Sequence, residues 1–205
     1  MLQHHTTVTY RWDLGLAGGQ PSKVSALDPR SEIVNIAMSD TVTAAVESSG
    51  QVFTWSQDGA MKHLPGLNGI SIVNIAVGDK FYCLLTDRGI LLTMGEGRTG
   101  CLGHGDTRDL ASPRIVEALL GDDITALATG SSHVAVVTGD GELFTWGQGG
   151  GLGQGQGDKE PLTSPEIVDI DEDVEKVRHH EHSQSASKWS LPGCVWPGRY
   201  SCDCP

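Results

Sequence analysis

The chain has 205 residues, a formal net charge of −12 and 38% hydrophobic residues, a composition that is ordinary for one folded domain or two small ones. The acidic balance argues against duplex DNA or RNA as the main partner, because lysine and arginine must neutralise backbone phosphates in such complexes. No segment approaches the roughly 18 to 20 apolar residues of a membrane span, and the N-terminus lacks the charged and apolar regions of a signal peptide. Five cysteines, an odd number, do not make a disulfide framework, so we expect a cytoplasmic protein.

The N-terminal segment begins in the middle of a repeated motif. Thr9–Trp12 (TYRW) matches Val52–Trp55 (VFTW) and Leu143–Trp146 (LFTW) position for position. We therefore expect residues 1–8 to be a stub and residues 9–177 to be a set of repeats.

Three copies of one unit follow, over residues 33–55, 72–105 and 124–155. Their register is set by two columns, a glycine and, five residues later, a large apolar residue. The glycines are Gly50, Gly89 and Gly141, and the apolar residues are Trp55, Met94 and Trp146. Successive glycines are 39 and then 52 residues apart, and a period near 50 is typical of a repeat array.

Each copy has the pattern of short antiparallel strands. Val134–Thr138 and Leu143–Trp146 flank a glycine turn and predict a hairpin, while Ile124–Ala128 and Arg114–Ala118 predict two further strands. Four short strands per unit are typical of a propeller blade and predict an all-β fold, a β-propeller of about three to four antiparallel four-stranded blades. We place the blades around residues 9–55, 56–94, 95–146 and 147–177. The link between Trp55 and Ile72 is short and lacks the glycine-rich loop of the other copies, so we expect a strand to be missing there.

Several motifs suggest chemistry but have a simpler structural explanation. Gly95–Gly100 matches G-x-G-x-x-G, yet a nucleotide site needs a helix opening at its end, and Gly103, Gly105 and Pro113 follow instead. His104 and His133 occupy repeat positions, which favours structural hydrogen bonds over acid–base roles. No paired carboxylates and no nucleophile–base pair stand out. We therefore expect no catalytic residue and no cofactor.

Residues 178–205 have no repeat register and are expected to form an irregular tail. Its potential metal ligands are His179, His180, His182, Cys194, Cys202 and Cys204. Cys202 and Cys204, like His180 and His182, are too close together to share one tetrahedral zinc ion easily. We expect no metal site.

Three motifs resemble the repeats of the regulator-of-chromosome-condensation superfamily, whose propellers have seven blades. They are Gly100–Gly105 (GCLGHG), Gly130–His133 (GSSH) and Asp140–Gly147 (DGELFTWG). Leu85–Gly89 and Ile115–Gly121 resemble the C-terminal propeller of never-in-mitosis-A-related serine/threonine kinases of the ciliary and spindle type. The resemblance implies structural repeat roles for Gly103, Gly105, Gly130 and His133. The chain departs from the family pattern in its short second copy, at Ser39-Asp40 where glycine is expected, and after Val177.

The resemblance implies a non-catalytic module that binds other proteins and regulates a kinase, with a kinase domain in the same polypeptide or cytoskeletal and ciliary proteins as partners. It also implies a location at the centrosome or cilium. One alternative is a fragment of an active kinase whose catalytic domain lies upstream, since the chain lacks the motifs of phosphoryl transfer. A second alternative is guanine-nucleotide exchange on a small GTPase. The resembled propellers close with seven blades, so the resemblance implies that this chain forms a partial β-propeller with an incomplete ring. Such a ring leaves open blade edges, and we therefore also expect self-association.

Overall fold

The computed structural model describes residues 32–39, 41–56, 61–149 and 160–169, together with four short strands nearer the termini. Those four are β1 (Tyr10–Arg11), β2 (Ser22–Lys23), β15 (Arg178–His180) and β16 (Lys188–Ser190). The predicted stub, residues 1–8, lies outside the described residues. No helix in the described ranges is both long and apolar enough to cross a membrane.

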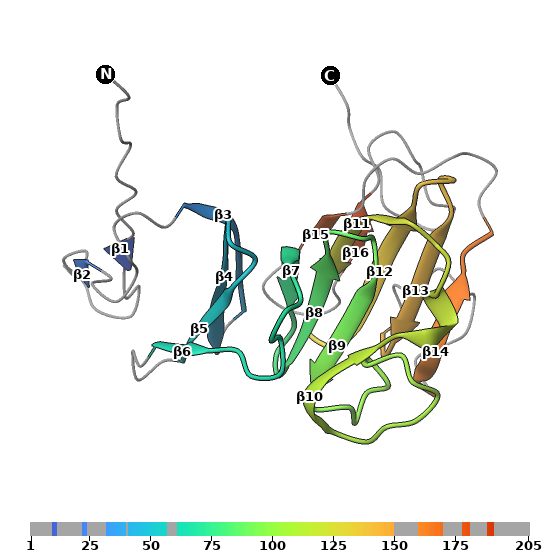
Figure 1. Cartoon of the computed structure of the whole chain (residues 1–205). Coiled ribbons are helices and arrows are strands. Elements are labelled where there is room, and N and C mark those ends of the chain that lie inside the picture. The colour runs from blue at the N-terminus through green and yellow to red at the C-terminus, as the bar shows by residue number, and fades with distance from the viewer. Residues whose placement is uncertain are drawn as a thin grey trace, which may run out of the picture.

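Three four-stranded antiparallel sheets stand side by side (Figure 1). The first contains β3 (Ile33–Met38), β4 (Val42–Glu47), β5 (Val52–Ser56) and β6 (Met61–His63). The second contains β7 (Ile72–Val77), β8 (Phe81–Thr86), β9 (Leu91–Gly95) and β10 (Leu110–Ile115). The third contains β11 (Ile124–Thr129), β12 (His133–Thr138), β13 (Leu143–Gly147) and β14 (Leu162–Ile167).

Within each sheet the strands pair in chain order, and the first strand of each sheet lies next to that of its neighbour, β3 beside β7 and β7 beside β11. This is the arrangement of propeller blades around an axis, with the first strand innermost. The three sheets do not close into a ring within the described residues. The predicted all-β fold, with about three to four repeats and an incomplete ring, is confirmed.

Two strand predictions were wrong. The strand expected to be missing after Trp55 is present as β6, a strand of three residues that residues 57–60 separate from β5. The strand expected at Arg114–Ala118 is β10, which begins at Leu110, and a 3-10 turn at Glu117–Leu119 follows it. The predicted strand began only after Pro113, because proline usually interrupts a strand. β10 is the outermost strand of its sheet, and proline costs no ladder hydrogen bond there.

The predicted blade limits at residues 55, 94 and 146 fall at or next to the end of the third strand of a sheet. Each sheet therefore takes its fourth strand from the following predicted unit, and the sheets run over 33–63, 72–115 and 124–167. Within the tail expected to be irregular, β15 pairs with β16, and β15 lies against β11. The side chains of the tail's potential metal ligands are outside the described residues.

The cores of the molecule lie between sheets. One cluster joins the first and second sheets and includes Ala44, Val46, Ile75, Val77 and Leu84. A second joins the second and third sheets around Trp146. Each sheet thus buries its faces against its neighbours, as repeat units do when a single unit cannot form a core alone.

The first sheet exposes a strip that its neighbour buries. Ile36 and Met38 on β3 correspond by repeat register to Ile75 and Val77 on β7, which pack against the first sheet. Ile75 and Val77 are 3% and 7% exposed, whereas Ile36 and Met38 are 54% and 69% exposed. The exposed strip is the face to which a preceding sheet would pack, and apolar surface of this kind favours association.

We predict that the isolated chain self-associates through this strip. Sedimentation velocity at micromolar concentration is expected to show dimers or larger species, and the double change Ile36→Asp and Met38→Asp should shift them toward monomer. Leu120→Asp, at another exposed apolar position away from the strip, is the control and should leave the distribution unchanged. A monodisperse monomer of the unaltered chain would contradict the prediction.

Candidate protein-binding face

The first turns of the three sheets meet at one side of the molecule around a hollow. The turns that join first to second strands bring Ser39, Asp79 and Ser131 to its wall, and Met38 and Thr129 lie beside them. The hollow has a volume of about 360 Å³. It joins three segments that are far apart in sequence, so we name it, with its three turns, the turn-side hollow.

Hydrogen bonds between neighbouring sheets hold the turns in place. The Thr41 hydroxyl donates to the Asp79 carbonyl oxygen at 2.7 Å, and the Asp79 amide donates to the Ser131 carbonyl oxygen at 3.2 Å. Deeper between β3 and β7, the Asn35 side-chain amide donates to Asn74 Oδ1 at 2.9 Å. The wall of the hollow is therefore a fixed surface made from three units.

At two of these turns an aromatic or imidazole ring lies so close to the backbone that only glycine fits. A Cβ at Gly130 would clash with Cε1 of His133, and one at Gly78 would clash with Cε1 of Phe81. Both rings are buried and lie over the glycine of their own turn. The Gly130 and His133 positions are thus a packing pair.

Ser39 stands where the family pattern has glycine, and the packing of the first sheet explains this difference. Val42 occupies the position of Phe81 and His133 in the first sheet and has no ring to cover the turn. The side chain of Ser39 fits there, and its hydroxyl accepts from the Val42 amide at 3.3 Å. A serine therefore replaces the expected glycine where the partner residue is smaller.

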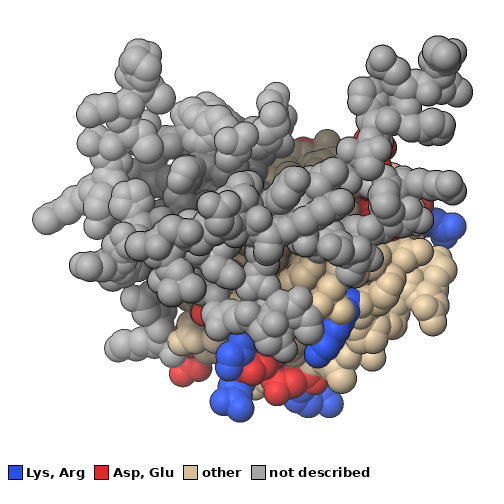
Figure 2. Space-filling view, turned by 90° about the vertical axis from the view of Figure 1, so that its left-hand side faces the viewer, with Lys and Arg blue, Asp and Glu red and all other residues tan. Residues whose placement is uncertain are grey.

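Positively and negatively charged side chains lie on the side of the molecule that carries the turn-side hollow. In the space-filling view, lysine and arginine lie beside aspartate and glutamate along the lower edge of the described surface (Figure 2). Lys80 Nζ lies 3.2 Å from Glu96 Oε1, and Arg108 Nε donates to Asp106 Oδ2 at 2.7 Å. The hydrogen bonds from Arg108 lower the pKa of Asp106. A mixed rim of this kind suits polar contacts with another protein rather than a single-sign ligand.

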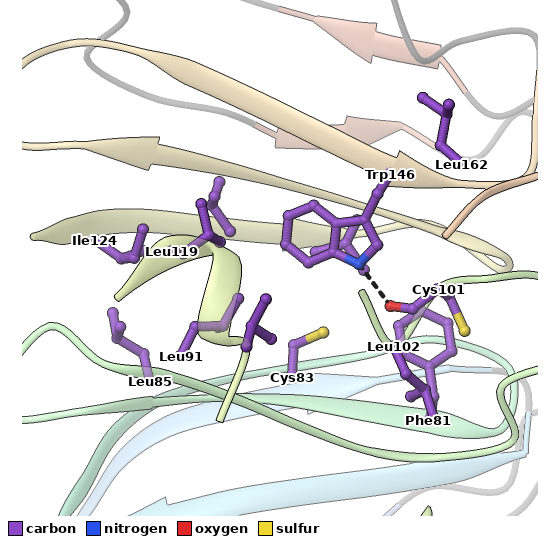
Figure 3. Close-up of a cluster of buried hydrophobic side chains, with 13 residues drawn as sticks. Phe81, Cys83, Leu85, Leu91, Cys101, Leu102, Leu119, Ile124, Trp146 and Leu162 are labelled. Carbon is purple, nitrogen blue, oxygen red and sulfur yellow. Dashed lines mark hydrogen bonds between the residues drawn. The ribbon is translucent and has the colours of Figure 1, made fainter. Parts of the chain in front are cut away.

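The glycine-rich loop 96–109 crosses from the second sheet to the third. Trp146 is fully buried, and its indole Nε1 donates to the Cys101 carbonyl oxygen at 2.8 Å (Figure 3). A Cβ at Gly103 would lie 3.0 Å from that nitrogen, and the Gly105 amide donates to the Thr163 carbonyl oxygen at 2.8 Å. Gly103 and Gly105 thus lie where the loop is held against the third sheet.

His104 lies in the same loop. The Thr93 hydroxyl donates to the Leu102 carbonyl oxygen at 2.6 Å and lies 2.9 Å from His104 Nε2. Burial, followed by the charge of Arg114, lowers the pKa of His104, which favours the neutral ring at pH 7. This contact holds loop and strand together. The G-x-G-x-x-G motif at Gly95–Gly100 is part of the same loop, which leads into β10 and opens no helix.

The hairpin glycines lie at the opposite side of the sheets. Gly50, Gly89 and Gly141 occupy equivalent turns between second and third strands, with φ of 81°, 71° and 82°. Residues with a Cβ rarely adopt this conformation, which explains the column of glycines. Five residues later, Trp55, Met94 and Trp146 are all buried.

The described residues offer little for metal or thiol chemistry. They contain no group of three or more histidine, cysteine, aspartate or glutamate side chains that could hold a metal ion. Burial raises the pKa of Cys83 well above its ordinary value and that of Cys101 to about 11. Both thiols therefore stay protonated at neutral pH and belong to the core between the second and third sheets.

Comparison with known proteins agrees with this geometry. Models of the regulator of chromosome condensation (RCC1) repeat match residues 88–137 and 124–154. The structure resembles that of human WBSCR16, with a TM-score of 0.67 and 22% identity over 77% of this chain and 45% of that one. It also resembles yeast RCC1 (Prp20) bound to Kap60, with a TM-score of 0.62 and 22% identity over 75% of this chain and 40% of that one. The chain belongs to the RCC1-repeat propeller superfamily.

Longer relatives carry the same repeats. The chain is 33% identical over 188 residues to the serine/threonine-protein kinase Nek8 of Danio rerio, a match that covers 82% of the chain and 26% of the kinase. It is 32% identical over 190 residues to the ultraviolet-B receptor UVR8 of Arabidopsis thaliana, covering 86% of the chain and 40% of the receptor. The chain thus spans about a quarter to two fifths of the length of these two relatives.

Sequence reasoning identified the repeat columns but missed the turn-side hollow. Ser131 lies inside the GSSH motif, but no motif marks Met38 or Asp79, and the three residues meet only when three units are stacked. The available signal was their common position, at the end of the first strand of each copy for Met38 and two residues after that end for Asp79 and Ser131. The bond from Trp146 to Cys101 was missed for the same reason, since a backbone carbonyl leaves no trace in the sequence.

We predict that Trp146→Phe lowers the free energy of unfolding by about 1–3 kcal/mol, because it leaves the Cys101 carbonyl buried without its donor. Urea unfolding followed by circular dichroism measures the change. Met94 is at the equivalent position and has no N–H donor, so Met94→Leu should lower the free energy of unfolding by less than Trp146→Phe does. Equal losses in the two variants would contradict the role given to the indole nitrogen.

A second prediction concerns the two buried thiols. In a variant with the tail cysteines Cys194, Cys202 and Cys204 changed to serine, iodoacetamide should label the native chain very slowly at pH 8. A pKa of about 11 leaves roughly 100-fold less thiolate at Cys101 than its ordinary value of 9.0 would, and the thiolate is the reactive form. Labelling should become fast in urea. Rapid labelling of the native chain would show that the core between the sheets is open.

Proposed function

We propose that the chain is a non-catalytic protein-binding module that regulates a serine/threonine kinase, either in the same polypeptide or as a separate partner. The observation that carries the proposal is the similarity to Nek8, which runs across 82% of the chain and only 26% of that kinase. The shared part is therefore a repeat region accompanying a catalytic domain. By the same similarity we propose a cytoplasmic location, at the centrosome or cilium, which imaging of a tagged chain would test.

The turn-side hollow is the surface we propose for the partner. It is lined by the exposed Met38, by Asp79 and by Ser131, and its wall is fixed by hydrogen bonds between sheets. A fixed wall costs little conformational entropy on binding, and an apolar side chain beside polar groups is typical of a protein interface.

The experiment measures binding of the purified chain to the isolated catalytic domain of Danio rerio Nek8, by calorimetry, together with the rate of phosphorylation of a generic substrate. We expect micromolar binding and an altered rate, with no phosphate transfer by the chain alone. Asp79→Arg should weaken binding at least about tenfold by placing a long charged side chain in the hollow. Asp87→Arg makes the same change at the opposite end of β8 and should have no effect.

Three outcomes would count against the proposal. Absence of binding at micromolar concentration would contradict the kinase as partner, and equal weakening by both variants would contradict the turn-side hollow as the surface. Acceleration of nucleotide exchange on a small GTPase, without binding to the kinase, would favour the exchange function instead. The structure of yeast Prp20p described with its binding properties to Gsp1p and histones makes that assay a useful parallel arm.

A further inference from the structure

The link between the first and second sheets contains an exposed Asn-Gly pair. Residues 64–71 join β6 to β7 and cross from one sheet to the other (Figure 1). Asn68 and Gly69 are both exposed and form the centre of a four-residue turn, in which the Ile70 amide donates to the Leu67 carbonyl oxygen at 3.0 Å. Gly69 has a φ of 76°, and a Cβ added there would meet nothing within 4 Å. The pair is therefore open to solvent.

The Gly69 amide differs from the amides of the hairpin glycines. Those of Gly50, Gly89 and Gly141 donate to carbonyl oxygens of their own turns at 2.8, 3.2 and 3.1 Å. Among the residues that the structure describes, neither the Gly69 amide nor the Asn68 side chain makes a hydrogen bond. Asparagine is a chemically labile residue, and here neither a Cβ nor a hydrogen bond hinders the nitrogen that follows it.

We propose that Asn68 is a site of spontaneous deamidation. The Gly69 amide loses its proton to hydroxide, and its nitrogen forms a bond to Cγ of Asn68. The bond from Cγ to the side-chain nitrogen breaks, and that nitrogen takes a proton from water and leaves as ammonia, so that a five-membered succinimide remains. Water then opens the ring at either carbonyl and leaves aspartate or isoaspartate. The reactants are water and base alone, and the inference does not depend on the proposed kinase partner.

The two other asparagines of the chain are held in strands. Asn35 lies on β3 and Asn74 on β7, and the side-chain amide of Asn35 donates to Asn74 Oδ1 at 2.9 Å. Isoleucine follows each of them, and a β-branched side chain hinders approach to its own amide nitrogen. The structure therefore distinguishes Asn68 from both.

Modification of Asn68 acts on the contact between the first two sheets. Leu67 and Ile70 pack against the cluster that joins these sheets, and a Cβ at Gly66 would lie 2.8 Å from Cδ of Pro113 on β10. Isoaspartate adds a methylene to the main chain between Leu67 and Ile70, which disrupts the hydrogen bond across the turn and shifts the two apolar side chains. The aged chain is therefore expected to be less stable than the fresh chain.

The test incubates the full chain at mildly alkaline pH, with and without urea, and maps its peptides by mass spectrometry at intervals. In the native chain, we expect deamidation at Asn68 to be at least about tenfold faster than at Asn35 or Asn74. The native rate at Asn68 should be within about tenfold of its rate in urea, because the turn is exposed. Asn68→Gln keeps a side-chain amide but would require a six-membered ring, so deamidation at this position should be lost.

The urea concentration at the midpoint of unfolding gives a second measurement. It should fall as the unaltered chain ages, whereas Asn68→Gln aged in parallel should keep its midpoint. Deamidation of Asn68 in urea alone would overturn the proposal, because the folded turn would then protect the pair. Equal rates at the three asparagines would overturn it as well, and an unchanged midpoint after complete deamidation would contradict the effect on the contact between the sheets.

Discussion

The packing of one four-stranded sheet against the next is the constraint on which the rest of this molecule depends. A sheet of this size has two apolar faces and too little of its own chain to cover either, so its stability comes from its neighbours. The cluster around Trp146 shows how the contact is made specific, because an indole of one sheet is bound to a carbonyl of the sheet before it. Apolar area supplies the attraction, and the hydrogen bond fixes the position.

Most of the stabilising apolar contacts lie between the faces of the sheets, so residues in the turns at the ends of the sheets can contribute to binding. The three first turns enclose a hollow of about 360 Å³ whose wall mixes apolar and polar groups. The hairpin turns at the opposite side are constrained by a glycine at an equivalent position in each sheet. Glycines are required on both sides, and the turn side, which carries the hollow, is the one suited to recognition.

Much of this architecture could be predicted from the sequence because the signals repeat. The glycine and tryptophan columns set the register, and alternation placed most strands correctly. β6 was missed because three residues give too short a pattern, and β10 was misplaced because Pro113 was taken as a boundary although an outer strand accepts it. The turn-side hollow and the bond from Trp146 to Cys101 could not be predicted, since both depend on how separate units meet.

The contact between Trp146 and Cys101 links the length of a loop in one sheet to the choice of residue in the next. Loop 96–109 of the second sheet supplies the acceptor for an indole of the third sheet, whereas only residues 57–60 separate the third and fourth strands of the first sheet. Met94, which stands in the second sheet where Trp146 stands in the third, has no donor and needs no such acceptor. A loop that is exchanged or shortened in one unit must therefore be matched by the side chain at this position of the following unit.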